Sequence, residues 1–247
     1  MTCFPSGPKT KRILLGIAAL ALAAGAGRAG DPVLFGGERW QPRVPMAHFA
    51  SPHPPPPGTV AIIDNINRLA GPVTYNCCQA YGVEGPQNWL NGMGGIESKI
   101  AVAFTPALNV AVTEIDVPIS YYAGTNSTVV GIYTDDHDKP GRMMRSWTFQ
   151  NLPPFNTCCG ILAATWPSGI AVVAGRQYWI VVQAAAPDTI SMWNITSVEP
   201  TTVRHIKRWC DDNQLPGGFH CLAPWMSHQW NPEDGAPTPA LAIIGKT

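Results

Sequence analysis

The chain has 247 residues and little charge: charged side chains make up only 13% of it. Four of the sixteen basic residues precede residue 30, whereas all sixteen acidic residues follow it. Twelve basic against sixteen acidic side chains leave the later part with a net charge of −4. Nucleic-acid binders carry a basic patch or stripe. We therefore expect no nucleic-acid partner and no electrostatic attraction to an anionic membrane.

Long apolar runs are also missing. The longest, residues 13–24, has twelve residues, whereas a membrane-spanning helix needs about 20. A basic stretch at residues 9–12 precedes it and small residues follow, which is the three-part pattern of a secretory signal peptide. Cleavage would follow Ala26 or Ala29. We expect residues 1–29 to be a signal peptide, and the secreted or periplasmic chain not to remain in the membrane.

Catalytic signatures are absent as well. Neither G-x-S-x-G nor H-E-x-x-H occurs. A glycoside hydrolase needs two facing carboxylates, and the sequence pairs none of the candidates Glu84, Glu97, Glu114 and Asp116. Three histidines are candidate zinc ligands, but their spacing matches no metalloenzyme signature: His205, His220 and His228. We expect no enzymatic activity and no cofactor, with a secreted hydrolase as the least favoured alternative.

Cysteine is present in a number that fits export. One of the seven, Cys3, would leave with the signal peptide, and the other six are Cys77, Cys78, Cys158, Cys159, Cys210 and Cys221. An even number in an exported chain indicates disulfides. The two Cys-Cys dipeptides either close on themselves or cross-link to each other. Cross-linking is favoured because it closes a long loop. Cys210 and Cys221 would staple a turn-rich loop.

Proline and glycine are abundant, at 25 and 24 residues. Residues 30–58 form a Pro-rich lead-in, which predicts an extended spacer. From residue 59 onward, period-two alternation and turn residues predict one antiparallel, jelly-roll-like β-sandwich over residues 59–247. The expected strands are Val60–Asp64, Ile100–Thr105, Val110–Tyr122, Thr128–Thr134, Met143–Phe149, Ile170–Val173, Gln177–Ala184, Thr189–Ile195 and Ala240–Gly245.

Two stretches depart from this rhythm. In the strand expected at Val110–Tyr122 the apolar parity changes at Thr113-Glu114, which predicts a β-bulge because one extra residue restores a single buried face. Residues 199–239 hold two cysteines and three tryptophans with few alternating positions. We expect a long Cys- and Trp-rich loop there, before the last strand, and long loops on a rigid sandwich often bind ligands.

Two groups of side chains are candidates for binding. Four tryptophans lie in loop-like surroundings and would stack on sugar rings or instead pin their loops to the sandwich: Trp89, Trp209, Trp225 and Trp230. Three carboxylates would supply oxygen ligands to calcium: Asp135, Asp136 and Asp138. The EF-hand pattern fails because Trp147 stands where the bidentate Glu belongs. A tight turn closed by Pro140-Gly141 is the favoured interpretation.

Four strand motifs resemble those of the bacterial exported β-sandwich domains called choice-of-anchor domains. The matching segments are residues 62–65, residues 132–135 running into 139–141, residues 173–182 and residues 240–245. The resemblance implies a secreted or surface sandwich without catalytic residues. This chain departs from the family pattern in two ways. It ends at the last expected strand without the C-terminal sorting anchor, and it contains the Cys-rich stretch 199–239. We expect a secreted, non-enzymatic module that binds an extracellular polysaccharide. The alternative is a structural surface protein acting through contacts with other surface proteins.

Overall fold

The computed structural model describes residues 57–87, 97–155, 160–197, 230, 232 and 237–247 with their side chains. Of residues 47–49, 89–90, 93–94, 206–211, 229 and 231 it describes the backbone. Every regular element in these residues is a strand. The same residues include no apolar helix of membrane-spanning length. The expected all-β class is confirmed.

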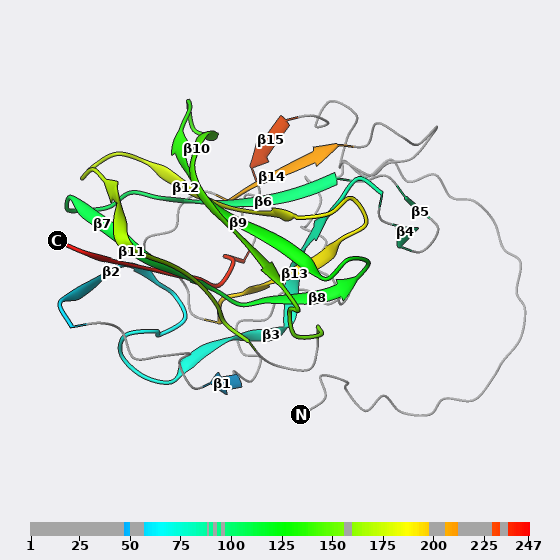
Figure 1. Ribbon diagram of the computed structural model, residues 1–247, viewed down its shortest axis with the longest axis horizontal. Coiled ribbons are helices and arrows are strands. Elements are labelled where there is room, and N and C mark those ends of the chain that lie inside the picture. Colours follow the sequence, from blue (N-terminus) through cyan, green and yellow to red (C-terminus); the bar gives the residue numbers. More distant parts are fainter. Residues whose placement is uncertain are drawn as a thin grey trace, which may run out of the picture.

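Ten strands form the larger sheet, and their pairings are antiparallel (Figure 1). Its main path runs β10 (Pro140–Gln150), β9 (Ser127–Asp135), β12 (Tyr178–Ala184), β6 (Glu97–Phe104), β3 (Val73–Glu84), β13 (Ile190–Ile195) and β8 (Ile119–Ala123). Three further strands lie off this path. They are β1 (Ala47–Phe49) on β3, β14 (Ile206–Asp211) on β6, and β15 (Gln229–Pro232) on β14.

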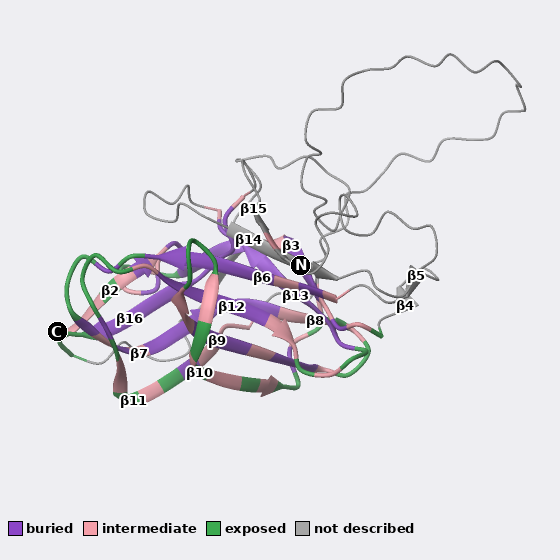
Figure 2. Ribbon diagram, turned by 90° about the horizontal axis from the view of Figure 1, so that it is seen from above, coloured by how far each residue is buried: buried purple, intermediate pink, exposed green. Residues whose placement is uncertain are grey.

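Four strands form the second sheet, in the order β11 (Leu162–Val172), β7 (Val110–Val117), β16 (Ala242–Lys246) and β2 (Thr59–Asp64). A short pair, β4 (Trp89–Leu90) and β5 (Met93–Gly94), lies outside both sheets. Figure 2 shows buried inner strands in both sheets, whereas most residues of β10 and β11 at the edges are half-buried or exposed. The two antiparallel sheets agree with the expected β-sandwich.

The main core fills the space between the sheets because alternate residues of each strand point inward. From β12 it receives Tyr178, Ile180 and Val182, and from β7 it receives four residues, Val110, Val112, Ile115 and Val117. Trp193 on β13 is fully buried in this core, and its Nε1 donates a 2.8 Å hydrogen bond to the carbonyl oxygen of Ala240, just before β16. This bond joins the larger sheet to the segment that enters the smaller one.

The bulge expected at Thr113 is confirmed. On β16, Ile244 pairs with Glu114 and the next residue, Gly245, pairs with Val112, so Thr113 is the extra residue of β7. The single strand expected at Val110–Tyr122 is wrong, because the chain changes sheets after β7 and continues as β8. Pro118 stands at the change, where a residue without a backbone N–H cannot continue the pairing.

Several strands were not expected from the sequence. The longest is β3, a twelve-residue central strand that contains Cys77 and Cys78, where no strand was predicted. Short β1 lies within the Pro-rich lead-in and pairs with the start of β3. The stretch 199–239 was expected to be a loop, but β14 and β15 within it form an antiparallel pair that extends β6. The loop prediction is therefore wrong for those residues.

Candidate functional site

The larger sheet carries a second apolar cluster on the face turned away from the main core. On β12, Trp179 and Val181 alternate with the core residues, and Ala101 and Ala103 occupy the paired positions on β6. All four are buried. Tyr133 of β9 and Trp230 of β15 pack against them, half-buried. We call this cluster, Ala101, Ala103, Tyr133, Trp179, Val181 and Trp230, the aromatic face.

A glycine supports the Tyr133 ring. A Cβ built on Gly131 would lie 2.7 Å from Tyr133 Cε2, so the ring lies directly over the bare backbone of β9. Any larger residue at this position would displace the ring. Burial raises the pKa of the Tyr133 phenol above its ordinary value, because low-dielectric surroundings disfavour the phenolate. Tyr133 therefore presents a neutral, supported ring with a polar hydroxyl.

Trp179 lies between Tyr133 and Ala103 on this face. It is fully buried and pairs in register with Tyr133 on one side and Ala103 on the other. Its Nε1 donates a 2.7 Å hydrogen bond to Asp135 Oδ1. Because no part of Trp179 is exposed, a ligand would contact its half-buried neighbours rather than this ring.

One of the four predicted binding tryptophans, Trp230, lies on the aromatic face. Within the hairpin, Trp209 of β14 pairs in register with Trp230 and, on its other side, with Lys99 of β6. Lys99 forms a 2.9 Å ion pair with Glu97 two residues earlier, and both side chains are about a quarter exposed. Trp89 lies in β4, opposite Gly94. The side chains of Trp89 and Trp209, and the whole of Trp225, lie outside the described residues.

The three calcium candidates lie at the turn that joins β9 to β10. Gln177 Nε2 donates to Asp135 Oδ1 at 2.9 Å and to Asp138 Oδ1 at 3.1 Å, while Asp135 Oδ2 accepts from the backbone N–H of Asp138. Asp136 is instead paired with His137 at 2.7 Å. Within the described part of the chain, no three such ligands gather around a common point. Asp135 and Gln177 thus form a polar rim at one end of the aromatic face.

Two of the candidate hydrolase carboxylates do meet. Glu114 and Asp116 both bond to Arg68 on the outer face of the smaller sheet. However, Asp116 has no exposed surface and Glu114 only 4%. Catalytic carboxylates must flank a substrate bond, so this buried pair is unsuited to hydrolysis in this conformation.

The structure describes two of the six cysteines with their side chains, Cys77 and Cys78. The sulfurs of Cys77 and Cys78 are 3.7 Å apart, whereas a disulfide bond is about 2.05 Å long. The two are therefore not joined to each other. Cys158, Cys159, Cys221 and the side chain of Cys210 lie outside the described residues, as do the candidate zinc ligands His205, His220 and His228.

Sequence reasoning missed Tyr133 as a site residue. It lies in the regular strand β9, whereas the aromatic candidates were tryptophans in loop-like surroundings. The available signal was the spacing of Gly131 and Tyr133, because residues two apart in a strand share a face.

No family model, no curated protein and no solved structure matches the chain.

Proposed function

We propose that the protein is a secreted, non-enzymatic β-sandwich that binds an extracellular polysaccharide through the aromatic face. The observation that carries this proposal is that the half-buried rings of Tyr133 and Trp230 both pack against one buried apolar patch of the larger sheet, with the polar groups of Asp135 and Gln177 at one end of it. Sugars offer apolar ring faces and many hydroxyls. Aromatic rings flanked by amide and carboxylate groups suit both parts.

The remaining parts of the proposal come from the sequence. Export through removal of residues 1–29 places the chain where polysaccharides occur, and the resemblance to choice-of-anchor domains agrees with a surface or secreted role. The mass of the protein recovered from culture medium tests export. A mature chain beginning after Ala26 or Ala29 supports it, and recovery of the uncut chain inside cells contradicts it.

Retention on insoluble polysaccharides tests the binding role. Cellulose, chitin and peptidoglycan serve as probes, and Trp230→Ala is compared with wild type. We expect roughly tenfold weaker retention of the variant on whichever probe binds wild type, the equivalent of about 1.4 kcal/mol. Trp166→Ala is the matched control, because that half-buried tryptophan belongs to β11 of the smaller sheet.

The same assay separates the alternatives. Self-association that persists in Trp230→Ala, without retention of wild type on any probe, would favour a structural surface protein over a sugar-binding module.

A further inference from the structure

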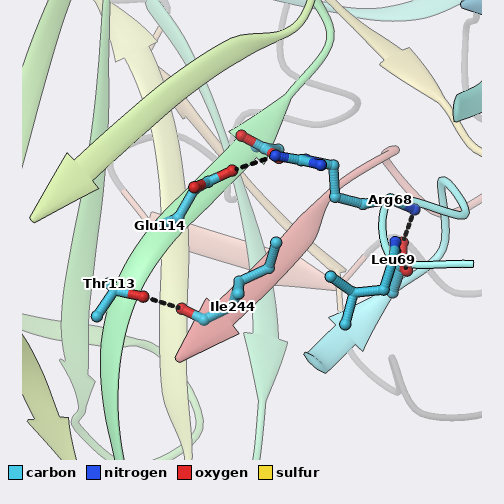
Figure 3. A network of polar contacts seen from close by, with 7 residues as sticks. Arg68, Leu69, Thr113, Glu114 and Ile244 are labelled. Carbon is cyan, nitrogen blue, oxygen red and sulfur yellow. Dashed lines mark hydrogen bonds and ion pairs between the residues drawn. The ribbon is translucent and has the colours of Figure 1, made fainter. Parts of the chain in front are cut away.

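A buried ionic cluster fixes the β2–β3 connection to the smaller sheet, and the proposed sugar binding makes no use of it. Arg68 lies in this connection and has a fully buried side chain. Its Nε donates to Asp116 Oδ2 at 2.5 Å and its Nη2 to Glu114 Oε1 at 2.9 Å. Figure 3 shows the Arg68 side chain reaching from the connection toward Glu114 on β7. We call these three residues the carboxylate clasp.

The register of β7 explains why the carboxylates face outward. Val112, Ile115 and Val117 point into the main core, and the bulge at Thr113 keeps this parity. Glu114 and Asp116 therefore belong to the opposite face, where the β2–β3 connection covers the sheet. Ile66 of this connection belongs to another buried cluster, shared with β3 and β16 and consisting of Ile66, Val73, Tyr75, Ala240, Ala242 and Ile244. The clasp lies beside this cluster.

The charges of the clasp do not balance if both carboxyl groups are ionised. One guanidinium would then face two carboxylates, leaving a net negative charge inside the protein, and an uncompensated buried charge is strongly unfavourable. Asp116 Oδ1 is buried and accepts no hydrogen bond within the described part of the chain. If Asp116 were ionised, its Oδ1 would carry negative charge without a hydrogen-bond donor from the described residues.

The surrounding ionisable groups do not remove this imbalance. Asp64 accepts hydrogen bonds from the backbone N–H groups of Arg68 and Leu69 through its two oxygens. Tyr75 and Cys77 on β3 belong to the neighbouring cluster. Tyr75 is neutral as a phenol, and Cys77 is neutral as a thiol or in a disulfide. Lys246 is at the far end of β16, where it pairs with Ala111 rather than with Asp116.

We propose that Glu114 and Asp116 share one proton, carried on the Asp116 Oδ1 side, so that the clasp as a whole is neutral. The protonated oxygen then acts as a hydrogen-bond donor toward Glu114, and the atom that lacks a donor no longer needs one. Arg68 keeps both of its bonds. The attachment of the β2–β3 connection to β7 through the clasp therefore depends on this proton.

The direction of the pKa shift agrees with this arrangement. Burial, and then the charge of Glu114, raise the pKa of Asp116 to about 8, while Arg68 acts in the opposite direction. In the unfolded chain an Asp side chain titrates near 3.9. The contribution of the proton to stability is therefore complete below pH of about 4 and is lost as the pH rises toward about 8. Alkaline conditions loosen the clasp.

The variant Asp116→Asn tests the proposal, because an amide reproduces the protonated acid: its oxygen accepts from Arg68 and its NH₂ donates to Glu114. The folding equilibrium constants of wild type and variant are measured by urea denaturation at several pH values. We expect the wild-type-to-variant ratio to fall by up to tenfold per pH unit between about pH 4 and 8. Asp188→Asn, at an exposed carboxylate, is the control and should give a flat ratio.

A ratio that stays flat or rises with pH would overturn the proposal, because it would mean that Asp116 is ionised in the folded protein. Infrared spectroscopy gives a second readout that does not depend on stability. Wild type at pH 6 should show the carbonyl stretch of a protonated carboxyl group, and both Asp116→Asn and Glu114→Gln should lack it. Persistence of that band in both variants would also refute a proton shared by this pair.

Discussion

At the scale of single residues, two glycines share one backbone conformation but have different surroundings. Gly124 and Gly175 both have φ of +73°, a left-handed conformation that costs other residues about 1–2 kcal/mol. A Cβ on Gly124 would lie 1.8 Å from the backbone oxygen of Asp188, whereas no atom lies within 4 Å of a Cβ on Gly175. Substitution at the two sites therefore separates the cost of conformation from the cost of a clash.

We expect Gly175→Ala to lower the free energy of unfolding by about 1 kcal/mol. Gly124→Ala should lower it by about 3 kcal/mol or more, since the Asp188 backbone cannot move aside as a flexible side chain would. Thermal or urea denaturation measures both. Equal losses would show that the turn after β8 relaxes around the added methyl group.

At the scale of elements, the bulge of β3 is the least ordinary feature of the larger sheet. On β13, Asn194 pairs with Ala80 and the next residue, Ile195, pairs with Asn76, so residues 77–79 are extra on β3. Asn76 closes this bulge, because its Oδ1 accepts from the N–H groups of Cys78 and Gln79 at 3.0 and 3.2 Å. The cysteine dipeptide thus interrupts the ladder of a central strand.

The described residues on either side of the second dipeptide lie near this bulge. Ile161 packs against the same cluster as Cys77, and Phe155 packs against a cluster containing Ala80. Two residues of extended chain reach about 7 Å, so the cysteine two positions before Ile161 is within reach of the bulge. We predict that Cys77 and Cys78 are cross-linked to Cys158 and Cys159.

Peptide mapping without reduction tests the cross-link. A linked pair of peptides containing residues 77–78 and 158–159 is the expected product, together with a separate link between Cys210 and Cys221. Recovery of Cys77 and Cys78 as a single ring within one peptide would contradict the prediction, as would a free thiol at either position.

Much of the strand pattern could be predicted from the sequence, because half-buried strands alternate clearly. The residues 128–134 and 177–184 correspond closely to β9 and β12. In contrast, β3 was missed since its polar residues Asn76 and Gln79 are buried and satisfied by each other at 2.8 Å. Alternation of apolar and polar residues cannot identify a strand whose buried positions are themselves polar.

The candidate site was only partly predictable, for a related reason. Trp230 was identified because an isolated loop tryptophan is conspicuous, but its neighbours come from β9, β12 and β6, far away in sequence. The pairing of Trp179 with both Tyr133 and Ala103 depends on strand order. Composition and periodicity do not specify strand order, so the aromatic face emerges only from the topology.

At the scale of the whole molecule, the two sheets differ in what covers their outer faces. The smaller sheet is covered by the β2–β3 connection, held by the carboxylate clasp. The larger sheet carries the aromatic face, where half-buried rings of Tyr133 and Trp230 remain partly accessible. This asymmetry makes the larger sheet the proposed binding side.

Two tyrosine variants test whether a polysaccharide binds on the aromatic face. Tyr133→Ala removes the supported ring, whereas Tyr122→Ala removes an exposed ring on β8, at the opposite edge of the same sheet. Depletion of each protein from solution by cellulose, chitin and peptidoglycan is the measurement. We predict about tenfold weaker binding for Tyr133→Ala and wild-type binding for Tyr122→Ala. Equal binding by both variants and wild type, or no binding by wild type to any polysaccharide, would contradict the account.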